Sequence, residues 1–234
     1  MGAELVLYDR AFDECLDRLA GIRADFRDVL LVGCPNPAWP QRLGARRVTV
    51  IDPGPLMAEQ AGGQHADLES LPFDGMAFKL VLCIGVLETA NNLALAMAAL
   101  HLVLKPGGLL IGAMAGGQSL PRLRQAMLAA DAVAGRASPH LHPRIEGPGL
   151  AQLLTGAGFA MPVIDVDRVE LSYGSLDGLV CDLRAMGVTN ILHSRSRRPL
   201  SRPALDAARA AFRDGAGRAS EQVEILHFAG WKAS

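Results

Sequence analysis

The sequence predicts an α/β fold in which helices cover both faces of a doubly wound, largely parallel sheet. Through the first half of the chain, short apolar runs alternate with segments of helical periodicity. The runs at 29–32, 48–51, 80–84 and 109–114 are almost wholly apolar, as expected for parallel strands that are buried on both faces. Ligands of such sheets bind beyond the carboxyl ends of the strands, so we expect a site there.

Length and composition favour a single domain. The chain has 234 residues, of which 50% are hydrophobic, and this is enough for one sizeable core. We expect a helical cap over 1–27, a core over 28–170 and 220–234, and a helical insertion over 171–219.

Charge and cysteine usage exclude several classes of protein. The formal net charge is −1 and no basic block dominates, so nucleic acid is not an expected partner. The N-terminal segment carries acids throughout, so we predict neither a secretory signal nor a membrane span, and a cytoplasmic location. The four cysteines are widely spaced without a CxxC pair, which disfavours a zinc site or a disulfide framework.

The remaining elements of the first half follow from periodicity and from helix-end signals. Apolar residues recur at helical spacing over 12–22, which predicts an amphipathic helix above the sheet or above the mouth of a pocket. A weak strand is expected at 65–68. Two asparagines at 91–92 can cap the next helix, which the KPGG segment at 105–108 stops.

The second half alternates less regularly. Its predicted elements are helices over 119–134, 149–158, 175–186 and 204–213, and strands over 163–169 and 222–228. The helices over 175–186 and 204–213 lie in the insertion and are joined by an arginine-rich loop. We expect this insertion to determine specificity.

The segment between the first two strands has the outline of a nucleotide-cofactor site. Gly33 follows the first strand, and Asp52 ends the second about 20 residues later, where an acid can accept hydrogen bonds from ribose hydroxyls. The turn contains Pro35 and Pro37, which fix φ and remove backbone donors where glycines would let a ligand approach. Trp39 either packs on the sheet or, beside these prolines, fills space that part of a cofactor would occupy. The sequence therefore predicts a degenerate cofactor loop.

Several downstream motifs resemble one protein family. They are LKPGGLLIGAMAGGQSLPRLR at 104–124, SPH at 138–140, DLRAMGVTN at 182–190 and AGWK at 229–232. With them the chain resembles the class I S-adenosylmethionine-dependent methyltransferases, in the branch containing the respiratory complex I assembly factor that hydroxylates a protein arginine. The malonyl carrier-protein methyltransferase of biotin synthesis is a more distant relative. The resemblance implies a Rossmann-like seven-stranded sheet with an antiparallel C-terminal hairpin.

The resemblance also implies a cofactor and the residues that hold it. S-adenosylmethionine presents a sulfonium, a carboxylate, a ribose and an adenine, so its site needs backbone donors, a carboxylate and an apolar slot. Asp52 matches the family's ribose acid, and Asp67 with Leu68 matches the pair beside the adenine. The full cofactor-binding set is Gly33, Cys34, Pro35, Asp52, Pro53, Asp67, Leu68 and Gly85. The two prolines of the loop predict weak cofactor binding or its loss.

Candidate substrate residues lie further along the chain. Tyr173 ends a predicted strand and could orient a substrate, although a half-buried structural tyrosine is commoner. Arg195, Arg197 and Arg198 would suit an acidic partner or a protein substrate, although a solvated loop explains them more simply. The SPHLHP segment at 138–143 contains two histidines without an identifiable carboxylate partner, so no metal is expected.

Three functions follow from the resemblance. The first is a methyltransferase-like protein that acts on, or docks to, another protein through the cleft between the strand ends and the insertion. The second is a non-catalytic respiratory-complex assembly factor or scaffold, with a complex I subunit as its partner. The third is a protein-arginine hydroxylase, which ranks lower because no 2-His-1-carboxylate set for oxygen activation is visible. The sequence favours an enzyme of the transferase type, and it assigns no catalytic residue.

Overall fold

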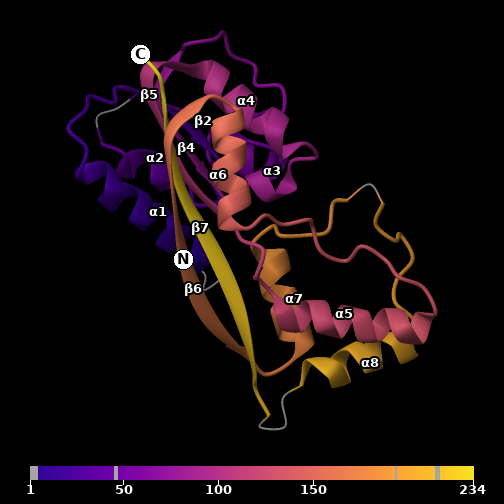
Figure 1. The fold of residues 1–234 in the computed structure, drawn as a ribbon. Coiled ribbons are helices and arrows are strands. Elements are labelled where there is room, and N and C mark those ends of the chain that lie inside the picture. The colour runs from indigo at the N-terminus through magenta and orange to yellow at the C-terminus, as the bar shows by residue number, and fades with distance from the viewer. Residues whose placement is uncertain (1–4, 45–46, 193, 214–216) are drawn as a thin grey trace. The chain divides into compact units, whose positions relative to one another are not determined.

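The computed structural model describes residues 5–44, 47–192, 194–213 and 217–234, and in its first half strands and helices alternate (Figure 1). The strands are β1 (Asp28–Val32), β2 (Arg47–Asp52), β3 (Gln64–His65), β4 (Phe78–Ile84), β5 (Leu104–Ala115), β6 (Phe159–Tyr173) and β7 (Ala219–Lys232). The helices are α1 (Val6–Ala20), α2 (Trp39–Arg42), α3 (Pro55–Gln60), α4 (Leu93–Val103), α5 (Pro121–Ala134), α6 (Gly147–Gly156), α7 (Leu176–Ala185) and α8 (Arg202–Phe212). No helix within these described ranges is long and apolar enough to cross a bilayer.

The strands form one seven-stranded sheet in the order β3-β2-β1-β4-β5-β7-β6. β1 pairs in parallel with β2 and β4, whereas β5 pairs in parallel with β4 and antiparallel with β7. The predicted doubly wound sheet with antiparallel C-terminal strands is therefore confirmed. Val32 lies opposite Ile51 on one side and Cys83 on the other, so the carboxyl ends of β1, β2 and β4 meet at one edge.

The centre of the sheet is buried because apolar residues point to both of its faces. α1 covers one face, and α4 and α6 cover the other (Figure 1). Met97 and Leu100 of α4 pack in the core on their face and are fully buried. On α1, Phe12 and Cys15 are fully buried as well. This packing fixes α1 above the strands that end at the candidate site.

Some element bounds differ from those predicted. β3 has only two residues, because the chain turns where the backbones of Asp67 and Ser70 form an isolated bridge. β5 begins at Leu104 rather than at 109, because the KPGG segment continues beside β4 across an irregularity in register. The predicted cap of α4 is confirmed at Asn92, whose side-chain oxygen accepts from Leu95 N at 3.1 Å.

The chain divides into two compact units. The first contains Met1–Ala115, Ile145–Asp167 and Ile225–Ser234, and the second contains Gly116–Arg144 and Arg168–Glu224. The second unit has a core of its own, to which α5, α7 and α8 contribute, with Phe212 among its fully buried side chains. β6 and β7 run through both units. The single domain with an insertion over 171–219 stays a prediction.

Candidate functional site

The loop after β1 turns at Gly33, and its geometry requires glycine. Gly33 has a φ of +82°, and a Cβ at this position would lie 2.3 Å from the carbonyl oxygen of Ile84. Such a contact is far shorter than a van der Waals distance. Glycine therefore lets the loop pass directly against the end of β4.

Asp52 ends β2, and its carboxylate faces this loop. Its Oδ2 accepts from Cys34 N at 3.0 Å, and its Oδ1 accepts from Gly54 N at 2.7 Å. Asp52 is only 4% exposed, and this burial raises the pKa of its carboxyl group although the two backbone donors and His65 act to lower it. Because a carboxylate can accept about four hydrogen bonds, acceptor capacity remains for two neighbouring hydroxyl groups.

Most backbone N–H groups of the loop after β1 already donate hydrogen bonds within the protein. Gly33 N donates to Ile51 O, Cys34 N donates to Asp52, and Pro35 has no N–H group. Burial, with a contribution from Asp52, raises the pKa of the Cys34 thiol to about 12, so this thiol is neutral at pH 7. An anionic ligand group therefore does not find here the row of backbone donors that a glycine-rich loop presents.

Side chains of helix α1 hold the loop in place through hydrogen bonds and ring stacking. Asp9 Oδ1 accepts from Asn36 Nδ2 at 2.9 Å and from Trp39 Nε1 at 2.7 Å. Trp39 is fully buried and stacks on Phe12, with ring centroids 4.5 Å apart and ring planes within 5° of parallel. The indole that follows the two prolines is thus packed against α1.

Tyr8 of the same helix reaches the end of β4. Gly85 follows β4 with a φ of +67°, and a Cβ there would lie 2.2 Å from Cε1 of Tyr8. Burial raises the pKa of the Tyr8 hydroxyl, and the nearby carboxylates of Glu88 and Asp52 raise it further. Neither Tyr8 nor Asp9 is marked in the sequence as a site residue, because both precede the apolar repeat that predicts α1.

Asp67 and Leu68 lie close to Asp52 through β3 and the residue that follows it. Ala66 N donates to Asp52 O at 3.2 Å. Leu68 is buried, whereas Asp67 is exposed and accepts from the backbone N–H two residues further on. Pro53 directly follows Asp52. The eight residues predicted to bind a cofactor therefore surround the carboxyl ends of β1, β2 and β4, and their role as ligands stays a prediction.

The four candidate substrate residues belong to the second unit. Tyr173 is half-buried, and burial followed by the effect of Asp182 raises its pKa to about 12. The three arginines are exposed. Arg195 donates to Leu192 O at 3.0 Å, and Arg198 lines a pocket of that unit.

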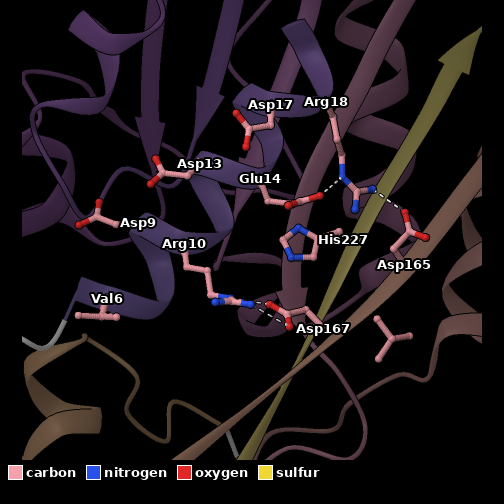
Figure 2. Close-up of a pocket in the computed structure, with 11 residues that line it drawn as sticks. Val6, Asp9, Arg10, Asp13, Glu14, Asp17, Arg18, Asp165, Asp167 and His227 are labelled. Atoms are coloured by element: carbon pink, nitrogen blue, oxygen red, sulfur yellow. Dashed lines mark hydrogen bonds and ion pairs between the residues drawn. The ribbon is translucent and has the colours of Figure 1, made fainter. Parts of the chain in front are cut away.

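A separate hollow in the first unit lies between α1 and the strands β6 and β7 (Figure 2). Its volume is about 700 Å³, and carboxylates predominate among its lining side chains. Arg10 is hydrogen-bonded to Asp167, and Arg18 is hydrogen-bonded to Asp165. The His227 ring also lines the hollow; it is buried, and its Nδ1 has no hydrogen-bond partner among the described residues.

Comparison with known proteins agrees with the fold. Residues 30–112 match the methyltransferase domain family. Over 232 residues the chain is 33% identical to the mitochondrial arginine-hydroxylase NDUFAF5 of Mus musculus, a match that covers 92% of this chain and 67% of that protein. The chain belongs to the NDUFAF5 branch of the methyltransferase family.

The chain is also similar to proteins that are named as methyltransferases. Malonyl-[acyl-carrier protein] O-methyltransferase of Laribacter hongkongensis is 32% identical over 171 residues, which cover 71% of this chain and 55% of that protein. Phosphoethanolamine N-methyltransferase 2 of Haemonchus contortus, solved in complex with S-adenosyl-L-methionine, shares the fold with a TM-score of 0.58 at 13% identity. That match covers 95% of this chain and 53% of the other. The chain spans about half to two thirds of the length of the NDUFAF5 proteins that it matches.

Proposed function

We propose that this chain binds S-adenosylmethionine and acts, as a methyltransferase-type protein, on another protein. The observation that carries the proposal is the Asp52 carboxylate, which two backbone donors hold at the end of β2 with acceptor capacity left for two adjacent hydroxyls. The comparisons support the choice of ligand and substrate class. The Haemonchus contortus enzyme was solved with this cofactor, and the Laribacter hongkongensis enzyme is named for a carrier-protein substrate.

The residues fit the nucleoside half of the cofactor better than its methionyl half. Asp52 suits the ribose hydroxyls, and the buried Leu68 offers an apolar surface for the adenine. On the other side, the Tyr8 ring lies against Gly85, and the loop has few uncommitted donors. When bound, the cofactor supplies a methyl group, and the protein contributes mainly by orienting it toward a nucleophile. We therefore infer that α1 has to shift for the methionyl half to enter.

Calorimetric titration with S-adenosylmethionine, and separately with adenosine, tests the proposal. Asp52→Ala should weaken both ligands by about tenfold or more, because it removes charge-assisted hydrogen bonds worth roughly 1.5–3 kcal/mol. The matched control is Asp74→Ala, since Asp74 is exposed and lies outside the site. It should leave both affinities unchanged. If wild-type protein shows no heat of binding with either ligand, the proposal is wrong.

The packing of the Tyr8 ring against Gly85 supports a second function, in which the cofactor site has closed and the protein docks to a partner without catalysis. The variant Tyr8→Ala separates the two functions. If α1 is a movable cap, removal of the ring should raise the affinity for S-adenosylmethionine more than that for adenosine. A closed site predicts that neither ligand binds wild-type protein.

The resemblance to the assembly factor makes a respiratory complex I subunit the first partner to test. Arginine-containing peptides of such a subunit can be incubated with the protein and S-adenosylmethionine, in the presence of O2 and a reductant, and then examined by mass spectrometry. A gain of one methyl group supports the leading proposal. A gain of one oxygen instead supports hydroxylation, the activity for which the NDUFAF5 relatives are named. Retention of the subunit with neither change supports the docking function.

A further inference from the structure

Two sequence segments that carry the family resemblance meet in the second unit, although neither contributes to the cofactor site. They are the SPH motif at 138–140 and the end of the DLRAMGVTN motif at 182–190. Asn190 Nδ2 donates to Pro139 O at 2.7 Å, and Ile191 N donates to His142 Nε2 at 3.0 Å. These two hydrogen bonds therefore hold together two loops that are distant in sequence.

The fastened loops enclose a pocket of about 460 Å³, which we call the SPH pocket. Among its lining residues are Asp131, Arg136, Ser138, His140, Asn190 and Arg198. The pocket lies within the size range of small-ligand sites. Its polar lining combines side chains from the end of α5, from the SPH motif and from the arginine-rich loop.

Asp131 organises the wall of this pocket. Its Oδ1 lies 2.8 Å from His140 Nε2, and its Oδ2 accepts from Ser138 N at 3.1 Å. Burial opposes ionisation of Asp131, but the hydrogen bonds from His140 and Ser138, together with the charges of His140 and Arg136, outweigh it, and the pKa of the carboxyl group is lowered. Both carboxylate oxygens are therefore engaged by the loop that they position.

The arginines of the pocket lack such partners. Neither Arg136 nor Arg198 has a carboxylate oxygen within 4 Å in the described part of the chain. The Arg136 guanidinium lies 3.4 Å, through Nη2, from Ser196 Oγ, whereas Arg198 contacts the same oxygen through its backbone N at 3.3 Å and itself lines the pocket. Ser201, which also lines the pocket, caps α8 through its side chain, so the positive end of that helix dipole lies nearby.

We propose that the SPH pocket binds an oxyanion, a phosphate or a carboxylate group, between the guanidinium groups of Arg136 and Arg198. Guanidinium groups donate paired hydrogen bonds to such anions, and the hydroxyl groups of Ser138 and Ser201 in the lining can add further donors. This site is independent of the cofactor site around Asp52. It gives the second unit a binding role of its own, for a ligand or partner that presents a single anionic group.

Titration of the full chain with phosphate, and separately with acetate, at constant ionic strength tests this site. The NMR signals of the His140 imidazole, assigned by comparison with His140→Gln, report on occupancy. Arg136→Gln and Arg198→Gln should each weaken binding by about tenfold, the effect of losing one charge-assisted hydrogen bond. The matched control is Arg197→Gln, which removes the same charge from the same exposed loop but lies outside the pocket lining. It should leave binding unchanged.

The relative affinities of the two anions identify the preferred source of the oxyanion. The proposal is overturned if neither anion moves the His140 signals, or if Arg197→Gln weakens binding as much as Arg198→Gln does. Thermal melting of each variant shows whether it remains folded. A failure of S-adenosylmethionine to bind would contradict the function proposed for Asp52 and would leave the result for this pocket unaffected.

Discussion

Gly33 and Gly62 require glycine for different physical reasons. Their φ values are +82° and +64°, but a Cβ at Gly33 would collide with Ile84 O, whereas a Cβ at Gly62 would meet nothing within 4 Å. We expect Gly62→Ala to lower the unfolding free energy by about 1 kcal/mol through backbone strain alone. Gly33→Ala should lower it by about 3 kcal/mol or more, because strain and collision add. Urea unfolding measures both values, and equal losses would contradict the packing of the loop on β4.

His227 makes stability depend on pH below neutrality. Burial lowers the pKa of its imidazole, and Arg18 lowers it further. The carboxylates of Glu14, Asp165 and Asp167 act in the opposite direction without reversing the shift. The unfolded chain therefore takes up a proton at this position near pH 6.5, while the folded chain does not. The unfolding free energy should fall as the pH drops from about 6.5 toward the lowered folded pKa.

The variant His227→Gln tests this prediction. It should show a smaller loss of unfolding free energy than wild-type protein between about pH 7.5 and about pH 5.5, measured by urea unfolding. Part of the pH dependence should remain, because the pKa of His101 is lowered as well, chiefly by burial. An unchanged pH dependence in the variant would mean that the folded protein accommodates a proton on His227 as readily as the unfolded chain does.

At the scale of elements, α1 couples the N-terminal segment to the cofactor loop through Asp9. Asp9→Ala should lower the unfolding free energy by about 2 kcal/mol, because it leaves the buried Trp39 Nε1 without its acceptor. Hydrogen exchange of the loop around Asn36 should become faster. Asp9→Asn keeps an acceptor and should recover part of the loss.

Asp17, on the same helix, is the matched control. It is exposed and lies one turn beyond Asp13, so that two like charges are neighbours on the helix surface. Asp17→Ala should change the unfolding free energy by no more than about 0.5 kcal/mol. If Asp17→Ala and Asp9→Ala lowered the unfolding free energy equally, the hydrogen bonds of Asp9 to the loop would not contribute to stability as predicted.

The elements that the sequence predicts best are those whose burial leaves a local pattern. The apolar runs locate β1, β2 and β4 to within two residues, because strands buried on both faces have few polar positions. α1 is harder to predict, since its apolar repeat begins at Phe12 while the helix begins at Val6. Its first turns contact the cofactor loop rather than extending the periodic face, and such contacts leave no periodic signal.

In the candidate site, too, some residues can be predicted from the sequence and others cannot. Gly33 and Asp52 can be found from their spacing, because each follows or ends a strand of the βαβ unit. The packing of Tyr8 on Gly85 cannot, because it joins residues far apart in the sequence and depends on how α1 lies on the sheet. Sequence reasoning therefore finds the residues that could hold a cofactor and misses the side chain that covers them.

At the scale of the whole molecule, the separate core of the second unit predicts that this unit can open by itself. Phe212 is fully buried in that core, and Phe212→Ala should destabilise it by about 3–5 kcal/mol. Hydrogen exchange should then accelerate in α5, α7 and α8 while β1 and β4 keep their protection. Equal acceleration in every element would instead show that the chain unfolds as one cooperative domain.

β7 can pair only after the ribosome has made it, yet β7 lies between β5 and β6 in the finished sheet. While the residues between β6 and β7 are being translated, one edge of β5 and the whole of β6 have no final neighbour. This interval lasts a few seconds at ordinary elongation rates. Unpaired strand edges are templates for pairing with other chains. The nascent protein should therefore depend on chaperones most strongly during that interval.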